Sequence, residues 1–247
     1  MKSNMNIIRS ILRVLLIFST FVFNVIASEN QAVNISPNKG FRVTLFNKWG
    51  GPQLHILEKQ TYVPLRVHKS AYTRIIPFQK DNSIILYSKV DGKKGHEGYK
   101  PFLRVHVPDS INEPLLLLNW NSKDQKVEER IIEFSPRKFK YGTYQIVNLS
   151  DTPISGAIGA QYNSYTCEAQ SSYISNFDIK EGAKIPITAY AKKTEVNLSL
   201  VYSVPTIHRH RKRVIFFLKP ERNKTGHLTC KAQSVVDFVK TEKPIRN

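Results

Sequence analysis

Short apolar runs, separated by turn-forming residues, are the feature that most constrains how this chain can fold. After residue 40 they recur roughly every 8–15 residues, and Val, Ile, Tyr, Phe and Thr supply most of their members. Such residues favour strands, whereas the Gly, Pro, Asn and Asp between the runs favour turns. Helical periodicity is almost absent after residue 28; residues 127–134 fit a helix modestly, but their β-branched content favours a strand. The pattern predicts an all-β sandwich or barrel.

The expected strands form two series. The first covers residues 41–47, 53–58, 62–68, 73–78, 83–90, 102–107 and 115–120. The second opens at Gly142 and covers residues 143–148, 154–161, 173–179, 184–191, 195–204, 213–218 and 228–239.

The two series resemble each other in order and composition. Residues 41–47 match 143–148, residues 84–88 match 198–203, and residues 115–118 match 215–218, at offsets of roughly 100 to 115 residues, the size of one immunoglobulin-like sandwich. We therefore predict two tandem immunoglobulin-like β-sandwich domains, joined near residues 121–140. The alternative is one large β-sandwich. The expected limits are 38–122 and 133–222, with 223–247 as a C-terminal strand or tail.

The first 27 residues have the features of a cleavable signal peptide. Three bases precede an apolar run at residues 14–23, and Val25 and Ala27 suit the −3 and −1 positions of a cleavage site. A membrane anchor is the competing interpretation, but the 14 residues from Val14 to Ala27 are fewer than the roughly 20 that span a bilayer. We expect an exported protein, periplasmic or extracellular, without a transmembrane segment in the mature chain.

The mature chain is strongly basic. Removing the three bases of the signal segment leaves 34 Lys and Arg against 19 Asp and Glu, a net charge of +15. This balance favours anionic partners such as phosphate polymers, acidic polysaccharides or anionic membranes. A generic solvated surface explains the charge equally simply. Nucleic acid is the least expected polyanion, because export removes the protein from most of it.

Two segments concentrate the positive charge, residues 137–141 and residues 207–213. Arg and Lys can hold phosphate or sulfate groups, but the same segments also suit a solvated loop or a strand edge protected against pairing. In 137–141 the aromatics can face the core while the bases face water. The candidate polyanion contacts are Lys138, Lys140, Arg209, Arg211, Lys212 and Arg213.

No sequence motif predicts catalysis, a metal or a cofactor. A nucleophile elbow, a zinc-protease helix motif, a phosphate-binding loop and a Cys-x-x-Cys pair are all absent from the sequence. His208 and His210 would share a face of a strand, but their basic neighbours repel a cation and no nearby carboxylate completes a site. Glu128, Glu129 and Glu133 resemble paired catalytic carboxylates, yet Arg130 among them favours surface charges.

The mature chain has two cysteines, Cys167 and Cys230. An even pair in an exported chain suggests one disulfide, which would close a loop of about 60 residues. The alternative is a pair of free thiols.

Residues 141–153 carry a Gly turn, a strand that ends in Asn-x-Ser, and a Pro-bearing turn. Together with the apolar runs at 115–118 and 215–218, this segment resembles exported bacterial β-sandwich proteins of uncharacterised function. The resemblance implies the fold and assigns no functional residue. We expect a non-enzymatic binding or structural module at the cell envelope, partnered by an anionic polymer or another envelope protein. A secreted hydrolase whose site assembles only in the fold is the alternative.

Overall fold

The computed structural model describes residues 40–79, 82–90, 98–159, 163–175, 177–192 and 197–239. The predicted signal peptide lies outside these residues. Within them the regular structure consists of strands, and no helix has the length and apolar character needed to cross a bilayer. The all-β prediction is therefore confirmed, and the segment 127–134 is a strand as expected.

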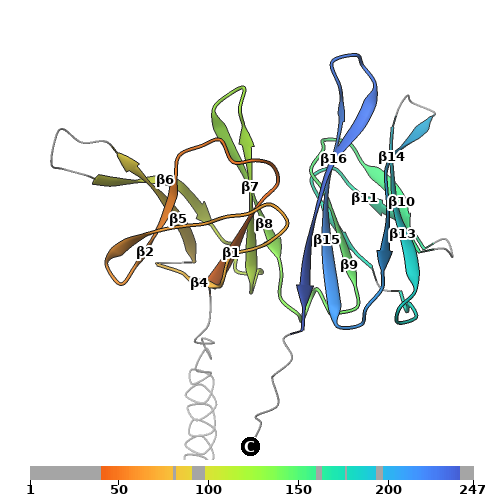
Figure 1. Ribbon diagram of the computed structural model, residues 1–247, viewed down its shortest axis with the longest axis horizontal. Coiled ribbons are helices and arrows are strands. Elements are labelled where there is room, and N and C mark those ends of the chain that lie inside the picture. The colour runs from red at the N-terminus through yellow and green to blue at the C-terminus, as the bar shows by residue number, and fades with distance from the viewer. Residues whose placement is uncertain are drawn as a thin grey trace, which may run out of the picture. The chain divides into compact units, whose positions relative to one another are not determined.

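The first eight strands form two four-stranded sheets (Figure 1). One sheet has the order β4-β1-β7-β8 and the other the order β3-β2-β5-β6. The strands are β1 (Gly40–Leu45), β2 (Leu54–Glu58), β3 (Thr61–Pro64), β4 (Ile76–Pro77), β5 (Ser83–Val90), β6 (Gly98–His106), β7 (Pro114–Asn121) and β8 (Lys126–Glu133).

The next eight strands form a second pair of sheets, with the orders β12-β9-β15-β16 and β11-β10-β13-β14. The strands are β9 (Tyr144–Asn148), β10 (Ile154–Ile158), β11 (Ser164–Cys167), β12 (Ser172–Ile174), β13 (Lys184–Lys192), β14 (Leu198–Ile207), β15 (Lys212–Arg222) and β16 (Leu228–Phe238). Among the strands of the described residues, only β11 is not predicted from the sequence; it has four residues, of which Ser164 and Thr166 are exposed.

The second sandwich repeats the topology of the first, with every strand number raised by eight. Both contain one parallel pair, β1 with β7 and β9 with β15. In each sandwich, the sheet without the parallel pair has a register shift in one hairpin. The shift lies at Leu86/Tyr87 between β5 and β6 and at Ala189/Tyr190 between β13 and β14. The paired sheets agree with two β-sandwiches in tandem rather than one large sandwich.

One of the three matches drawn from the sequence is wrong. Residues 84–88 lie in β5, whose topological counterpart is β13, whereas residues 198–203 lie in β14. The sequence misled because β14 is an edge strand with apolar residues on its exposed face: Leu198 is 60% exposed and Leu200 is 53% exposed. The presence of apolar residues in the sequence therefore does not by itself distinguish this edge strand from a buried one.

The limits of the sandwiches include two strands that sequence analysis placed outside its domains. β8 pairs with β7 from Pro114↔Glu133 to Asn121↔Lys126, and β16 pairs with β15 along the full length of both strands. Both are edge strands of their sheets and carry many exposed polar residues, which makes them resemble connecting segments in the sequence. Residues 134–143 then connect the two sandwiches.

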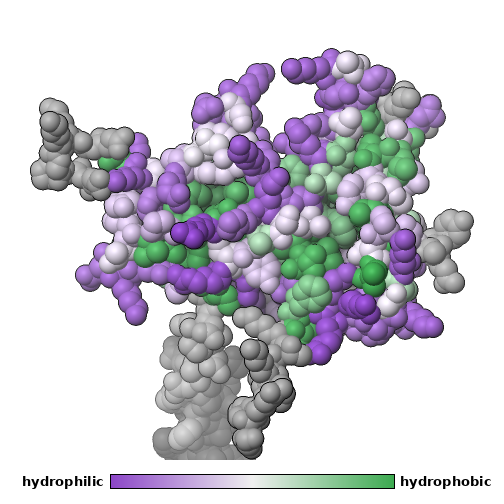
Figure 2. Space-filling view, viewed as in Figure 1, coloured by the Kyte–Doolittle hydropathy of each residue, from purple (hydrophilic) through white to green (hydrophobic). Residues whose placement is uncertain are grey.

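Three apolar clusters hold the sheets together. One fills each sandwich, and the third lies between the sheet β4-β1-β7-β8 and the sheet β12-β9-β15-β16. On β7, Leu116 and Leu118 belong to the first sandwich, whereas Leu115 and Leu117 belong to the third cluster. β15 is divided in the same way. A strand buried on both faces needs continuous apolar sequence, which explains the runs 115–118 and 214–218. Figure 2 shows hydrophilic residues gathered on the loops and hydrophobic residues over the strands.

A buried ion pair lies beside this third cluster. Arg213 is 2% exposed, and its Nε and Nη2 both lie 2.8 Å from Asp237 Oδ2. Its Nη1 donates to the carbonyl of Phe139 at 2.8 Å, and its guanidinium stacks 4.1 Å from the ring centre of Phe134. Arg213 was predicted to contact a polyanion at the surface. That prediction is wrong, because its guanidinium is enclosed and its donors are engaged inside the protein.

Asp237 also connects the two sandwiches. It accepts hydrogen bonds from the hydroxyls of Tyr72 and Tyr141 in addition to those from Arg213. Burial, together with the hydrogen bond to Asp237, raises the pKa of Tyr72 well above its usual value, so the phenol stays protonated. Because Tyr72 belongs to the first sandwich and Asp237 to β16 of the second, the carboxylate joins the two domains through hydrogen bonds.

We expect Asp237→Ala to lower the free energy of unfolding by about 3–5 kcal/mol, since it leaves the buried Arg213 charge without a partner. Urea denaturation measures this change. Lys231→Ala is the control, because its ion pair with Glu221 is largely exposed and should contribute at most about 1 kcal/mol. An Asp237→Ala variant as stable as the control would contradict the structural role of the pair.

The predicted disulfide is not present in the structure. Cys167 and Cys230 are both free. The Cys167 sulfur, on β11, lies 3.5 Å from the Ser171 carbonyl and 3.7 Å from that of Ile146. The Cys230 sulfur, on β16, lies 3.4 Å from the carbonyl of Lys231. Each thiol thus points to a nearby backbone carbonyl and not to the other thiol. Both cysteines pack on the core of the second sandwich.

We predict that neither thiol reacts readily in the folded protein. Burial raises the pKa of Cys230 to about 11, and Cys167 is only 1% exposed, so little reactive thiolate is accessible at pH 8. Iodoacetamide labelling followed by mass spectrometry should show slow modification in buffer and two labels per chain in urea without reductant. Fewer than two labels in urea would indicate that the disulfide forms.

Candidate functional site

The structure brings the two basic runs of the sequence together. β9 and β15 are parallel, with Tyr144 opposite Val214. The register continues before the strands, where the amide of Gly142 donates to the carbonyl of Lys212 at 2.8 Å. Arg213 reaches the carbonyl of Phe139 across the same junction. Residues 137–141 and 207–213, which are about 70 residues apart in sequence, therefore lie side by side at the start of the second sandwich.

The backbone at Gly142 lets the connecting segment enter β9 beside these residues. Gly142 has a φ of +83°, in the left-handed region that side chains rarely adopt. A Cβ at this position would lie 3.5 Å from the His210 carbonyl oxygen, which is ordinary van der Waals contact. The torsion, rather than the available space, therefore favours glycine here.

The predicted contact residues differ in how available their charges are. Lys140 and Arg211 are exposed, and neither has an ion-pair partner among the described residues. Lys138 donates to the carbonyl of Ser110 at 2.9 Å and lies 3.6 Å from Glu133. Lys140 and Arg211 are therefore the strongest candidates for contact with an anion.

Two other predicted residues are partly engaged. Arg209 Nη1 lies 3.3 Å from Glu181 Oε1. Lys212 is half-buried, donates to Thr206 Oγ1 at 3.3 Å and to the carbonyl of Ile207, and has its pKa lowered by burial and by the charge of Arg209. The basic surface, as we use the term, consists of Lys138, Lys140, Arg209, Arg211 and Lys212.

His208 and His210 lie in the turn after β14, beside the basic surface, and not on one face of a strand. The expectation that no carboxylate completes a site with them is wrong. Glu181, His208 and His210 each offer a ligand atom within 4.8 Å of the others. The turn before β13 brings Glu181 to the histidines, since the amide of Gly182 donates to the carbonyl of His208 at 3.0 Å. No pattern in the sequence indicates this carboxylate, because it lies 27 residues before His208 on another turn.

Hydrogen bonds hold the two imidazoles and the carboxylate of this cluster in place. His208 is 1% exposed, and its Nδ1 lies 3.0 Å from the hydroxyl of Tyr144. Burial, followed by the neighbouring His210, lowers the pKa of His208. The Nε2 of His210 lies 3.0 Å from the carbonyl of Ile179. A hydrogen bond from the amide of His210 is the main cause that lowers the pKa of Glu181, which keeps this carboxylate ionised.

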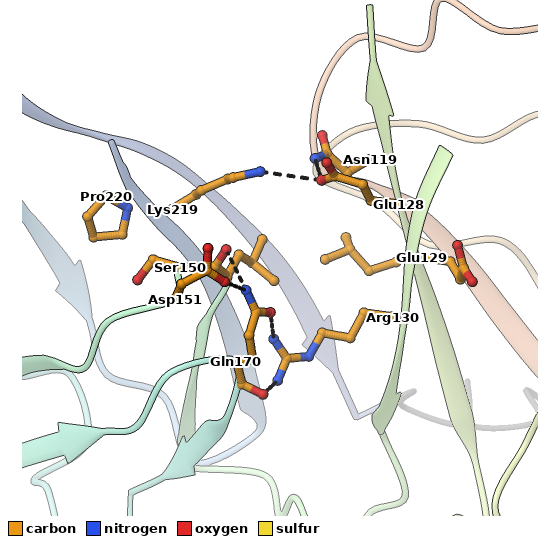
Figure 3. Close-up of a pocket in the computed structure, with 11 residues that line it drawn as sticks. Asn119, Glu128, Glu129, Arg130, Ser150, Asp151, Gln170, Lys219 and Pro220 are labelled. Atoms are coloured by element: carbon orange, nitrogen blue, oxygen red, sulfur yellow. Dashed lines mark hydrogen bonds and ion pairs between the residues drawn. The ribbon is translucent and has the colours of Figure 1, made fainter. Parts of the chain in front are cut away.

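A concave site lies between the two sandwiches (Figure 3). This groove has a volume of about 550 Å³, which is within the range of small-molecule sites. It is lined by Leu117, Asn119, Glu128, Glu129, Arg130, Leu149, Ser150, Asp151, Gln170, Lys219 and Pro220.

Charged and amide side chains in the groove pair with one another. Arg130 Nη1 donates to the Asn148 carbonyl at 2.8 Å and to Gln170 Oε1 at 3.2 Å. Lys219 lies 3.3 Å from Glu128, while Glu129, the next residue on β8, points away from the groove (Figure 3). Glu128 and Glu129 are therefore not convergent, because neighbouring residues on a strand face opposite sides.

Comparison with known proteins assigns no activity to these sites. No protein-family model matches the chain, and no curated protein matches its sequence. The chemistry of the basic surface, the histidine cluster and the groove therefore rests on their own residues.

We expect Arg130→Ala to lower the free energy of unfolding by about 1.5–3 kcal/mol, because it removes charge-assisted hydrogen bonds that cross from β8 to the second sandwich. Lys219→Ala, which removes a partly exposed ion pair in the same groove, should cost at most about 1 kcal/mol. Urea denaturation compares the two variants. Equal stability of both variants would show that the Arg130 contacts do not stabilise the domain junction.

Proposed function

We propose that this protein is an exported, non-enzymatic binding module of the cell envelope, built from immunoglobulin-like β-sandwiches, that holds an anionic polymer on its basic surface. The observation that carries the proposal is the joining of two distant basic runs at one end of the second sandwich. Export rests on the signal-peptide features of residues 1–27, and the immunoglobulin-like assignment rests on the strand pattern and the resemblance described above.

The charges of the surface support a polymer bearing phosphate or sulfate groups. The mature chain carries a net charge of +15, which attracts polyanions over long range. At short range Arg211 presents a planar guanidinium that can bind two oxygens of one group, and Lys140 presents a mobile ammonium. Arg209 is only partly neutralised by Glu181, because both side chains of this pair are about half exposed. Lys138 pairs with the more buried Glu133 and contributes less free charge.

The geometry also supports the binding of an extended anionic polymer rather than of a single anion. The basic surface is formed by a connecting segment and a turn that lie next to each other, so its charges are spread over both segments. An extended polymer can contact several such charges at once, and each contact releases counterions from the polymer. The groove between the sandwiches is less suited to a polyanion, because Glu128 and Asp151 contribute negative charge to its lining.

The test is the affinity of the mature chain for inorganic polyphosphate, measured by fluorescence anisotropy across a salt series. We expect Lys140→Ala/Arg211→Ala to weaken binding and to reduce the slope of log Kd against log salt by about 2, one for each lost contact. Dextran sulfate, used in parallel, tests whether sulfate groups bind the same residues.

The matched control is Lys123→Ala/Lys224→Ala, which changes the net charge by the same amount at exposed residues of two hairpins. Lys224 lies roughly 35 Å from Arg211, because the eleven residues of β15 separate them at about 3.3 Å each. Equal losses in both double variants would indicate attraction by net charge alone and would overturn the proposed site. Undetectable binding of the unmodified chain to both polymers at 20 mM salt would overturn the function.

A further inference from the structure

We propose that Glu181, His208 and His210 form a binding site for a divalent transition-metal ion such as Zn²⁺. The proposal is independent of polymer binding, since it rests on different side chains. Two imidazoles and one carboxylate are a ligand set that suits zinc and its neighbours in the first transition series.

The separations between the ligand atoms are close to those that a metal needs. Ligands about 2.0–2.1 Å from a tetrahedral ion lie roughly 3.3 Å from one another. His210 Nδ1 and Glu181 Oε2 are already 3.7 Å apart, and all three ligand atoms lie within 4.8 Å. Glu181 and His210 are exposed residues on turns, so modest side-chain rotation can close the remaining distance around the fixed ring of His208.

Hydrogen bonds outside the cluster orient both imidazoles. The Nδ1 of His208 is held by the hydroxyl of Tyr144, which leaves its Nε2 for a metal. The Nε2 of His210 is held by the carbonyl of Ile179, which leaves its Nδ1 beside Glu181. Metal-binding histidines commonly have the second ring nitrogen fixed in this way, because the contact sets the tautomer and the ring orientation.

The basic neighbours lower the affinity for a cation without excluding it. The guanidinium of Arg209 is paired with the other oxygen of Glu181, Oε1, and the ammonium of Lys212 is directed to Thr206 and Ile207. Three protein ligands leave one position of a tetrahedral ion open. The positive surroundings favour an anion in that position, so the site differs from a closed structural zinc site.

The test is a Zn²⁺ titration of the untagged mature chain after dialysis against EDTA, by isothermal calorimetry. We expect one ion per chain. His210→Ala and Glu181→Gln should each weaken binding by more than about tenfold, and Tyr144→Phe, which removes only the orienting hydroxyl, by about tenfold. Substitution with Co²⁺ should give the visible absorption of a four-coordinate ion, and this signal should disappear in His210→Ala.

His227→Ala is the control, because His227 is an exposed histidine in the β15–β16 hairpin and outside the cluster. It should leave Zn²⁺ binding unchanged. Urea denaturation in EDTA checks that Glu181→Gln and His210→Ala, both at exposed positions, remain folded. No uptake at 100 µM Zn²⁺, or uptake that persists in Glu181→Gln and His210→Ala, would overturn the metal site; the polymer test in EDTA is unaffected by either result.

Discussion

The apolar layer between the two central sheets is the constraint on which the rest of the structure depends. Leu115 and Leu117 of β7 meet Ile215 and Phe217 of β15 in this layer, while the alternate residues of both strands fill the separate sandwiches. The segments 115–118 of β7 and 214–218 of β15 are therefore buried on both faces and consist of apolar residues. Arg213 is the exception at the edge of the layer, and it is tolerated because Asp237, a carbonyl and aromatic rings surround its charge.

This layer also determines where the residues of the proposed sites are placed. β15 enters the layer directly after Arg211 and Lys212, so the basic surface lies at the N-terminal end of β15. Lys219 and Pro220, towards the other end of β15, line the groove between the sandwiches. The same strand thus connects an exposed cationic surface to a concave site of mixed charge, and the buried residues between them keep both in fixed positions.

The turn between β14 and β15 contributes to both proposed sites. It carries His208 and His210 of the proposed metal site together with Arg209 and Arg211 of the basic surface. The two proposals are physically compatible, because a bound divalent ion would add positive charge next to a surface proposed to hold an anion. The inward-facing His208 fixes the turn through Tyr144, whereas the outward-facing arginine Arg211 remains available to partners.

The sequence by itself determined the all-β class and nearly every strand, because alternation and turn residues act over a few neighbouring positions. It favoured the tandem arrangement but left one large sandwich as an alternative, which the pairing of the sheets then decided. Only the tertiary structure decided which charges are buried and which residues meet. Arg213 is one base among several in its run, and its burial follows from Asp237, 24 residues away, and Tyr72, which is 165 residues from Asp237. Glu181 joins His208 and His210 only through the folding of separate turns. Such contacts depend on sheet pairing and packing, for which a local pattern carries no signal.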